Sequence, residues 1–181
     1  EYDIVKLRAL FGVLFQDFVK YSFSLRENVA LSDLSRMNDN EAVKAACDNS
    51  NVSDFIHDWE NGIDENLTRR FDKQGKELSG GQWQRVSLAR AFFRDAPVIL
   101  LDEPSAALDP IAENQIFEDF ANMSKNKSAV LISHRLSSIT LANRILVLEN
   151  GCIIENGSHK ELLEKNGRYA YLFNLQASKY M

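Results

Sequence analysis

The sequence predicts an α/β protein in which a small helical lobe is inserted into a core of alternating helices and strands. Residues 78–181 alternate between helix and strand signals, whereas residues 19–77 are polar, rich in Asn and Asp, and carry only short helix patterns. Within the alternating part, Val98–Leu101 is an unbroken apolar run, which is typical of a strand buried on both faces. A succession of strand, helix and strand indicates an α/β core with some parallel pairing.

Length and composition narrow the possible functions. The 181 residues are 45% apolar and 26% charged, with a net charge of −5 and no basic block, which argues against nucleic acid as a partner. No apolar run approaches the roughly 20 residues of a membrane helix. The two cysteines, Cys47 and Cys152, form neither a metal-binding spacing nor a disulfide framework, so a reducing compartment is expected.

The first half of the chain predicts one strand and two short helices. The apolar run Phe11–Phe15 is of strand length. Asp39 and Ser53 are suited to cap helices. The first of these helices carries Ala42, Val43, Ala45 and Ala46, and the second carries Phe55, Ile56 and Trp59 before Gly62 stops it.

The second half predicts more regular elements. Gln82–Arg94 has a helical apolar face, Ala129–Ile132 is expected to be a second buried strand, and Asp109-Pro110 opens a helix with Ile116, Phe117 and Phe120 as its apolar stripe. Toward the end of the chain we expect two strands, Ile145–Leu148 and Cys152–Glu155, on either side of the turn Glu149-Asn150-Gly151. A capped helix, Ser158–Leu163, should follow and end at Gly167, and Tyr169–Leu175 should form a last helix.

The strongest chemical signal is a predicted strand that ends in two adjacent carboxylates. Val98–Leu101 leads directly into Asp102 and Glu103. Ligands of open α/β sheets bind beyond the carboxyl ends of the strands, and carboxylate oxygens suit Mg²⁺. Because neighbouring side chains on an extended segment diverge, one carboxylate can serve a metal and the other a water. The alternative is a solvated strand end without a chemical role.

A second signal is the pentapeptide Leu78–Gln82 at the start of a predicted helix. Gly80 and Gly81 allow the backbone to approach an anion, the helix N-terminus favours negative charge, and Ser79 adds a hydroxyl. Ser79 and Gln82 also fit an ordinary capping box. Both interpretations stay open, since a capped helix N-terminus can also bind an anion.

Three further residues carry weak signals when each is taken alone. His134 follows the predicted strand Ala129–Ile132 and could donate to a phosphate oxygen, although a surface loop histidine is the more common case. Gln16 follows Phe11–Phe15 and could bind Mg²⁺ or water through its amide oxygen. Asp109 is most simply a helix cap.

Taken in order, these motifs resemble the nucleotide-binding domain of an ABC transporter. Gln16 matches that family's Q-loop, and Leu78–Gln82 matches its signature motif. Val98–Glu103 matches the Walker B strand with its adjoining glutamate. Ser105–Asp109 matches the D-loop, and His134 matches the switch histidine. Ser22–Val29 and Gly151–His159 are similar to exporter-type domains, and Phe71–Glu77 to bacterial peptide or bacteriocin exporters. The resemblance extends over nearly the whole chain.

The resemblance implies a partial P-loop NTPase-like core, residues 1–18 and 96–181, and a helical signature subdomain, residues 19–95. It implies ATP and Mg²⁺ as ligands, Glu103 and His134 as catalytic residues, and Gln16 and Asp102 at the metal. The remaining expected nucleotide-binding residues, besides Gln16, are Ser79, Gly80, Gly81, Gln82 and Asp109. The implied partners are a second nucleotide-binding domain, expected to be an identical chain arranged head to tail, and a transmembrane domain. The implied location is the cytoplasmic face of a bacterial cell membrane.

One family motif is absent from the sequence. The phosphate loop Gly-x-x-x-x-Gly-Lys-Ser/Thr does not occur, because the single Gly-Lys pair, Gly75-Lys76, has Arg70 in place of the first glycine and is followed by Glu77. In the family this loop precedes the Q-loop, so we expect the chain to be part of a longer protein and to lack the first strands of the core. The chain also starts without Met.

Three functions compete at this stage. The first is the ATPase module of an exporter, and the second is a soluble ABC-type ATPase acting in DNA repair or translation. Soluble members often carry coiled coils or basic faces, and neither is found in this sequence. The third is an inactive interaction domain, which would not need an intact Glu103 or His134.

Overall fold

The computed structural model describes residues 3–104, 117, 118, 120, 121, 124, 127–135 and 139–178. The chain divides into two compact units, Glu1–Ile132 and Ser133–Met181, and each is described by itself. Asp109 and the start of its expected helix lie outside the described residues. Two residues of that helix's expected apolar stripe, Phe117 and Phe120, are described and buried.

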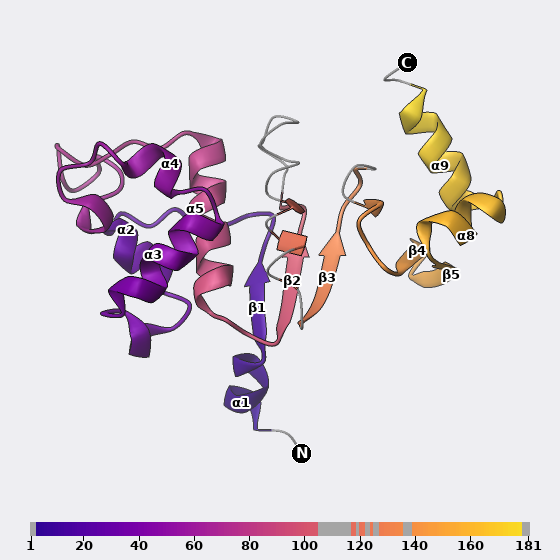
Figure 1. The fold of residues 1–181 in the computed structure, drawn as a ribbon, viewed down its shortest axis with the longest axis horizontal. Helices are drawn as coiled ribbons and strands as arrows, with labels where there is room; N and C mark the ends of the chain where they lie inside the picture. Colours follow the sequence, from indigo (N-terminus) through magenta and orange to yellow (C-terminus); the bar gives the residue numbers. More distant parts are fainter. Residues whose placement is uncertain are drawn as a thin grey trace. The chain divides into compact units, whose positions relative to one another are not determined.

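The first unit contains a parallel sheet with the strand order β1-β2-β3 (Figure 1). The strands span Phe11–Leu14, Val98–Asp102 and Ser128–Ile132. Leu14 lies opposite Leu101, and Asp102 lies opposite Ile132. The parallel pairing expected from the alternating sequence is therefore confirmed.

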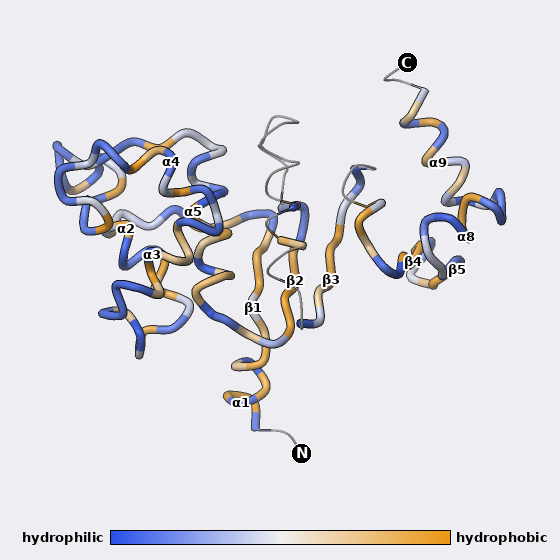
Figure 2. Tube along the Cα trace, viewed as in Figure 1, coloured by the Kyte–Doolittle hydropathy of each residue, from blue (hydrophilic) through white to orange (hydrophobic). Residues whose placement is uncertain are grey.

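The burial predicted for these strands is only partly correct. In β2, Ile99 and Leu101 are buried, but Val98 and Leu100 are half-buried. In β3, Val130 and Ile132 are 51% and 57% exposed, so the prediction of a buried strand is wrong. The reason is that β3 lies at the edge of the described sheet and pairs there with β2 alone. Figure 2 shows that its sequence is nevertheless apolar.

Helices of the first unit pack around one long helix. This helix, α5, spans Gly80–Phe93 and contacts α2 and α3 as well as β1 (Figure 1). In the range 3–104 the other helices of the unit are shorter: α1 Ile4–Ala9, α2 Leu25–Ala30, α3 Asn40–Asn49, α4 Ser53–Ile56, and the 3₁₀ turns Leu34–Arg36 and Gly62–Asp64. Nine residues of α5 are buried, so the helix lies in the interior instead of on the surface.

Two helix caps of this region turn out differently from each other. Asp39 caps α3 as predicted, because its carboxylate accepts a hydrogen bond from the N–H of Ala42 at 3.0 Å. Ser53 is not a cap: it is the first residue of α4, and its hydroxyl donates to Asp48. The helix ends at Ile56, before Trp59, and is therefore shorter than predicted.

The second unit is a hairpin followed by two helices. Strands β4, Ile145–Glu149, and β5, Cys152–Gly157, pair antiparallel as predicted, and Asn150 and Gly151 both adopt positive φ in the turn between them. Helices α8, His159–Glu164, and α9, Arg168–Ala177, follow. The α8 capping box of Ser158 and Glu161 is confirmed, whereas Gly167 precedes α9 instead of ending α8.

A half-buried arginine connects the segment after β1 to the helical bundle. Arg90 of α5 donates to the carbonyl of Val19, to the carbonyl of Asn28 and to the Asn28 side chain at 2.7–2.8 Å, and its guanidinium lies 5.2 Å from the ring centre of Tyr21. Burial lowers the pKa of Arg90 to about 10. Asn28, itself fully buried, donates to three carbonyls between Tyr21 and Ser24. Together these bonds fix the backbone that continues from Gln16.

Replacing Arg90 tests this connection. An ammonium cannot reproduce the planar fork or the contact with Tyr21, so Arg90→Lys should lower the free energy of unfolding by about 1–3 kcal/mol. The matched control is Arg85→Lys on the same helix. The Arg85 guanidinium makes two longer hydrogen bonds, to Asn51 and Asp54, and the Arg85 side chain is 22% exposed. Chemical denaturation should show a smaller loss for the control, and equal losses would contradict the assignment.

The two cysteines should differ in reactivity. Cys47 is fully buried in the helical bundle, where burial raises the pKa of its thiol to about 12, and Cys152 is exposed on β5. Because the thiolate is the reactive form, a thiol reagent at pH 8 should label Cys152 quickly and Cys47 only after unfolding. Mass spectrometry of the labelled peptides measures this, and rapid labelling of Cys47 in the native chain would contradict the described packing.

Candidate functional site

The carboxyl ends of the parallel strands bring three predicted site residues to one edge of the sheet. Gln16 and Glu103 each lie two residues beyond the paired residues Leu14 and Leu101, and Asp102 ends β2. Because β1 and β2 are parallel neighbours, the amide of Gln16 and the two carboxylates belong to the same edge. Gln16 is exposed, and Asp102 and Glu103 are half-buried.

Glu103 has a backbone conformation that is uncommon for residues other than glycine. Its φ is +48°, in the left-handed region, and its N–H donates to the carbonyl of Ile132 at 3.0 Å. Such conformations are costly and are held only where the surrounding structure fixes them. The chain therefore turns immediately after β2, which gives Asp102 and Glu103 different backbone settings and allows them different roles.

The donor atoms at this edge fit Mg²⁺. A carboxylate and an amide oxygen are hard ligands of the type that Mg²⁺ prefers, and this cation is usually bound by one or two protein ligands together with waters and phosphate oxygens. Among the described residues, no group of three or more His, Cys, Asp or Glu gathers to form a metal site. A cation held by Asp102 and Gln16 would thus take its remaining oxygens from water and from a bound phosphate.

The N-terminus of α5 carries the second predicted group. The capping box is confirmed: the Ser79 N–H donates to the Gln82 side chain at 2.9 Å, and the Gln82 N–H donates to the Ser79 hydroxyl at 3.3 Å. Ser79 and Gly80 are exposed, and Gly81 is half-buried. The first turn of α5 thus presents backbone N–H groups at an accessible helix N-terminus, where the helix dipole favours an anion.

His134 and Asp109 are not placed at this edge by the structure. His134 follows the end of β3 by two residues in the chain, belongs to the second unit and is exposed. Within that unit its carbonyl accepts a hydrogen bond from the Gln176 side chain of α9 at 2.7 Å. The neighbouring Arg135 N–H donates to the Ser133 hydroxyl at 3.0 Å. Asp109 lies outside the described residues.

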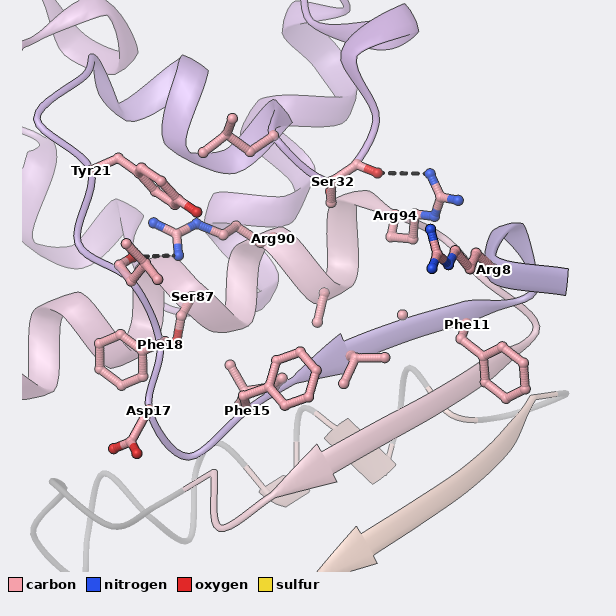
Figure 3. A pocket seen from close by; sticks show the side chains of 16 residues that line it. Arg8, Phe11, Phe15, Asp17, Phe18, Tyr21, Ser32, Ser87, Arg90 and Arg94 are labelled. Atoms are coloured by element: carbon pink, nitrogen blue, oxygen red, sulfur yellow. Dashed lines mark hydrogen bonds between the residues drawn. The ribbon is translucent and has the colours of Figure 1, made fainter. Parts of the chain in front are cut away.

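An open groove of about 540 Å³ lies beside the segment that carries Gln16 (Figure 3). Aromatic and arginine side chains dominate its lining, which includes Arg8, Phe11, Phe15, Phe18, Tyr21, Arg90 and Arg94. Among the described residues that line the groove, Asp17 is the one acidic residue. Figure 3 shows Arg8 and Arg94 at one end of the groove and Asp17 with Phe18 at the other. The groove therefore combines apolar surface with net positive charge.

Sequence reasoning missed two residues that connect these parts. Arg90 joins α5 to the segment after Gln16, and the buried side chain of Gln84 donates to the carbonyl of Pro104, which follows Glu103. The available signal is positional: Gln84 lies four residues before Leu88 and eight before Phe92, on the apolar side of the predicted helix. A polar side chain in such a position needs a partner in the interior.

Comparison with known proteins is consistent with this arrangement. Residues 1–106 match the family described as ABC transporter. The chain is 43% identical over 162 residues to the nisin transport ATP-binding protein NisT of Lactococcus lactis, covering 90% of the chain and 27% of the relative. It is 39% identical over 179 residues to the ATP-dependent lipid A-core flippase of Alcanivorax borkumensis, covering 99% of the chain and 30% of the relative.

A solved structure extends the likeness to the fold. A bacterial Atm1-family ABC exporter with ATP bound matches with a TM-score of 0.85 and 34% identity over 96% of this chain and 29% of the exporter chain. The chain thus spans less than a third of the length of these proteins. In the described ranges, none of the helices combines the length and apolar character needed to cross a bilayer.

The matched family model extends over more than half of the chain, and the signature pentapeptide and the carboxylate-ended strand both lie within it. The chain belongs to the ABC transporter family.

Proposed function

We propose that this chain is the ATP-binding and ATP-hydrolysing part of an export system, in which hydrolysis at a head-to-tail dimer interface drives transport across a membrane. The observation that carries the proposal is the placement of Gln16, Asp102 and Glu103 at one edge of a parallel sheet. The proposal is further supported by relatives whose names describe transport ATP-binding proteins and a flippase.

The proposed roles follow from the chemistry of each side chain. Asp102 and Gln16 hold Mg²⁺, which when bound supplies positive charge that stabilises the transferred phosphoryl group. Glu103 is the general base that orients or deprotonates the attacking water. Its left-handed backbone conformation differs from the strand conformation of Asp102, which allows the two carboxylates different roles.

Two copies are needed in this proposal because each contributes different groups to one ATP. The N-terminus of α5, with Ser79, Gly80, Gly81 and Gln82, contacts the phosphates of an ATP whose other contacts come from the second subunit. His134 holds the γ-phosphate, and Asp109 contributes from the segment after Glu103. We assign residues 1–18 and 96–181 to the ATPase core and residues 19–95 to the helical subdomain, and we expect the second subunit to be an identical chain.

The groove beside Gln16 is the proposed contact for a transmembrane partner. Its exposed Phe15 and its arginines favour a short amphipathic segment that carries apolar and acidic side chains. Because Arg90 binds the same segment that continues from Gln16, force on the groove would reach the metal-binding edge. With a transmembrane partner at the groove, the proposed location of the chain is the cytoplasmic face of a bacterial cell membrane.

The two alternatives are less well supported. A soluble ABC-type ATPase would not need a groove of this character next to the Gln16 segment. An inactive interaction domain would not need Glu103 in a strained conformation next to a metal-binding aspartate, because strain of this kind is maintained at functional sites.

Replacing the proposed general base separates binding from turnover. In the complete protein, Glu103→Gln should retain ATP binding and lose roughly 10²–10⁴-fold in ATP hydrolysis, because the amide cannot accept the proton. Nucleotide titration and phosphate release measure the two quantities. As a control, Glu149→Gln removes a half-exposed carboxylate of β4 and should leave both unchanged. Normal turnover by Glu103→Gln would refute the assigned role.

The 181-residue chain alone should bind Mg-ATP weakly and hydrolyse none. The phosphate loop, whose backbone and lysine hold the β- and γ-phosphates, does not occur in its sequence, so a large part of the phosphate contacts is missing. Isothermal titration with Mg-ATP checks this directly. Tight binding by the isolated chain would show that other residues hold the nucleotide.

A further inference from the structure

The segment that carries Glu103 is held by hydrogen bonds on both sides. Before the turn, the N–H of Glu103 donates to the carbonyl of Ile132 in β3 at 3.0 Å. After the turn, the carbonyl of Pro104 accepts a hydrogen bond from the side-chain Nε2 of Gln84. Gln84 is 3% exposed and Pro104 is buried, so this bond lies in the protein interior.

These two bonds fix a conformation that the chain does not adopt readily. Glu103 has a φ of +48°, which is unfavourable for a residue with a side chain, and it persists only where its neighbours are held in place. A buried carbonyl needs a donor, and a proline provides no N–H of its own. The Gln84 amide supplies such a donor from a separate, well-buried helix.

The position of Gln84 in α5 connects two parts of the proposed chemistry. Ser79 caps α5 and Gln84 is its fifth residue, so little more than one helical turn separates the N-terminus from the bond to Pro104. Nine of the residues of α5 are buried, and the helix is continuous from Gly80 to Phe93. The hydrogen bond from Gln84 therefore connects the helix that begins at Ser79 directly to the backbone that follows Glu103.

We infer that Gln84 is a positioning residue that sets the orientation of Glu103 and links it to the signature end of α5. The inference rests on the proposed function. In a head-to-tail dimer, the N-terminus of α5 faces the ATP whose other contacts come from the second subunit, while Glu103 acts in its own subunit's site. Gln84 would then connect the two ATP sites of the dimer through its hydrogen bond to Pro104.

The test uses Gln84→Met in the complete protein, because Met has a similar volume and no donor. We expect ATP hydrolysis to lose roughly 10- to 100-fold in kcat, since the general base is displaced, with KM for ATP changed less than about twofold. The matched control is Ser50→Ala, which removes another buried donor whose bonds, to Ala46 and Cys47, stay within its own helix. The control should keep the kcat of the unaltered protein.

A double variant distinguishes positioning from general damage. If Gln84 acts through Glu103, adding Gln84→Met to Glu103→Gln should cause no further loss of the residual rate. A further loss of the full single-variant size would overturn the inference. An unchanged kcat in Gln84→Met would also overturn the inference if Glu103→Gln has lost turnover. Retained turnover in Glu103→Gln would instead contradict the proposed function itself.

Gln84→Glu keeps the test decisive if the Met variant does not fold. A protonated carboxyl can donate to the Pro104 carbonyl, and an ionised one cannot. The activity of Gln84→Glu relative to the unaltered protein should therefore fall as the pH rises, because burial raises the pKa of a carboxyl and its ionisation removes the donor. A ratio that is constant with pH would contradict the role of the hydrogen bond.

Discussion

The burial of α5 is the constraint on which the rest of the first unit depends. Its residues contact α2 and α3 on one side and β1 on the other, so the helix joins the bundle to the sheet. The approach to the strand is close: a side chain added at Gly12 of β1 would come within 3.2 Å of the carbonyl of Ala91. Such contact fixes the helix relative to the strand that precedes Gln16.

The polar side chains of α5 convert this packing into specific connections. Arg90 reaches the segment that follows Gln16, and Gln84 reaches the segment that follows Glu103. Each buried polar group would be unfavourable without its partner, so the burial of the helix and the position of the two segments depend on each other. The same helix presents its capped N-terminus at Ser79 to solvent. One helix thus carries Ser79 at its N-terminus and binds the segments that follow Gln16 and Glu103.

Much of the fold could be predicted from local sequence. The strand before Asp102, the capping box at Ser79 and the turn at Asn150-Gly151 follow from patterns of a few residues, and the structure has all three. The exposure of β3 could not be predicted, because its apolar sequence does not reveal whether a neighbouring strand covers it. The cap at Ser53 failed because Asp48, five residues earlier, binds its hydroxyl.

In the candidate site, too, the features set by local sequence could be predicted and those set by tertiary packing could not. Gln16, Asp102 and Glu103 were predicted because each follows an apolar strand signal, and parallel pairing brings them to one edge. Gln84 and Arg90 escaped prediction because their partners, Pro104 and Val19, are distant in sequence and are reached only through tertiary packing. His134 lies in the second unit and Asp109 lies outside the described residues, so the roles proposed for them stay predictions.

The most direct test of the central claim is a structure of the complete protein carrying Glu103→Gln with Mg²⁺ and ATP. We expect a cation about 2.0–2.1 Å from its ligand oxygens, bound at the Asp102 and Gln16 edge directly or through water. The γ-phosphate should lie between this edge and Ser79–Gly81 of a second subunit. A nucleotide bound away from Asp102 and Gln16, or held entirely by one subunit, would contradict this claim.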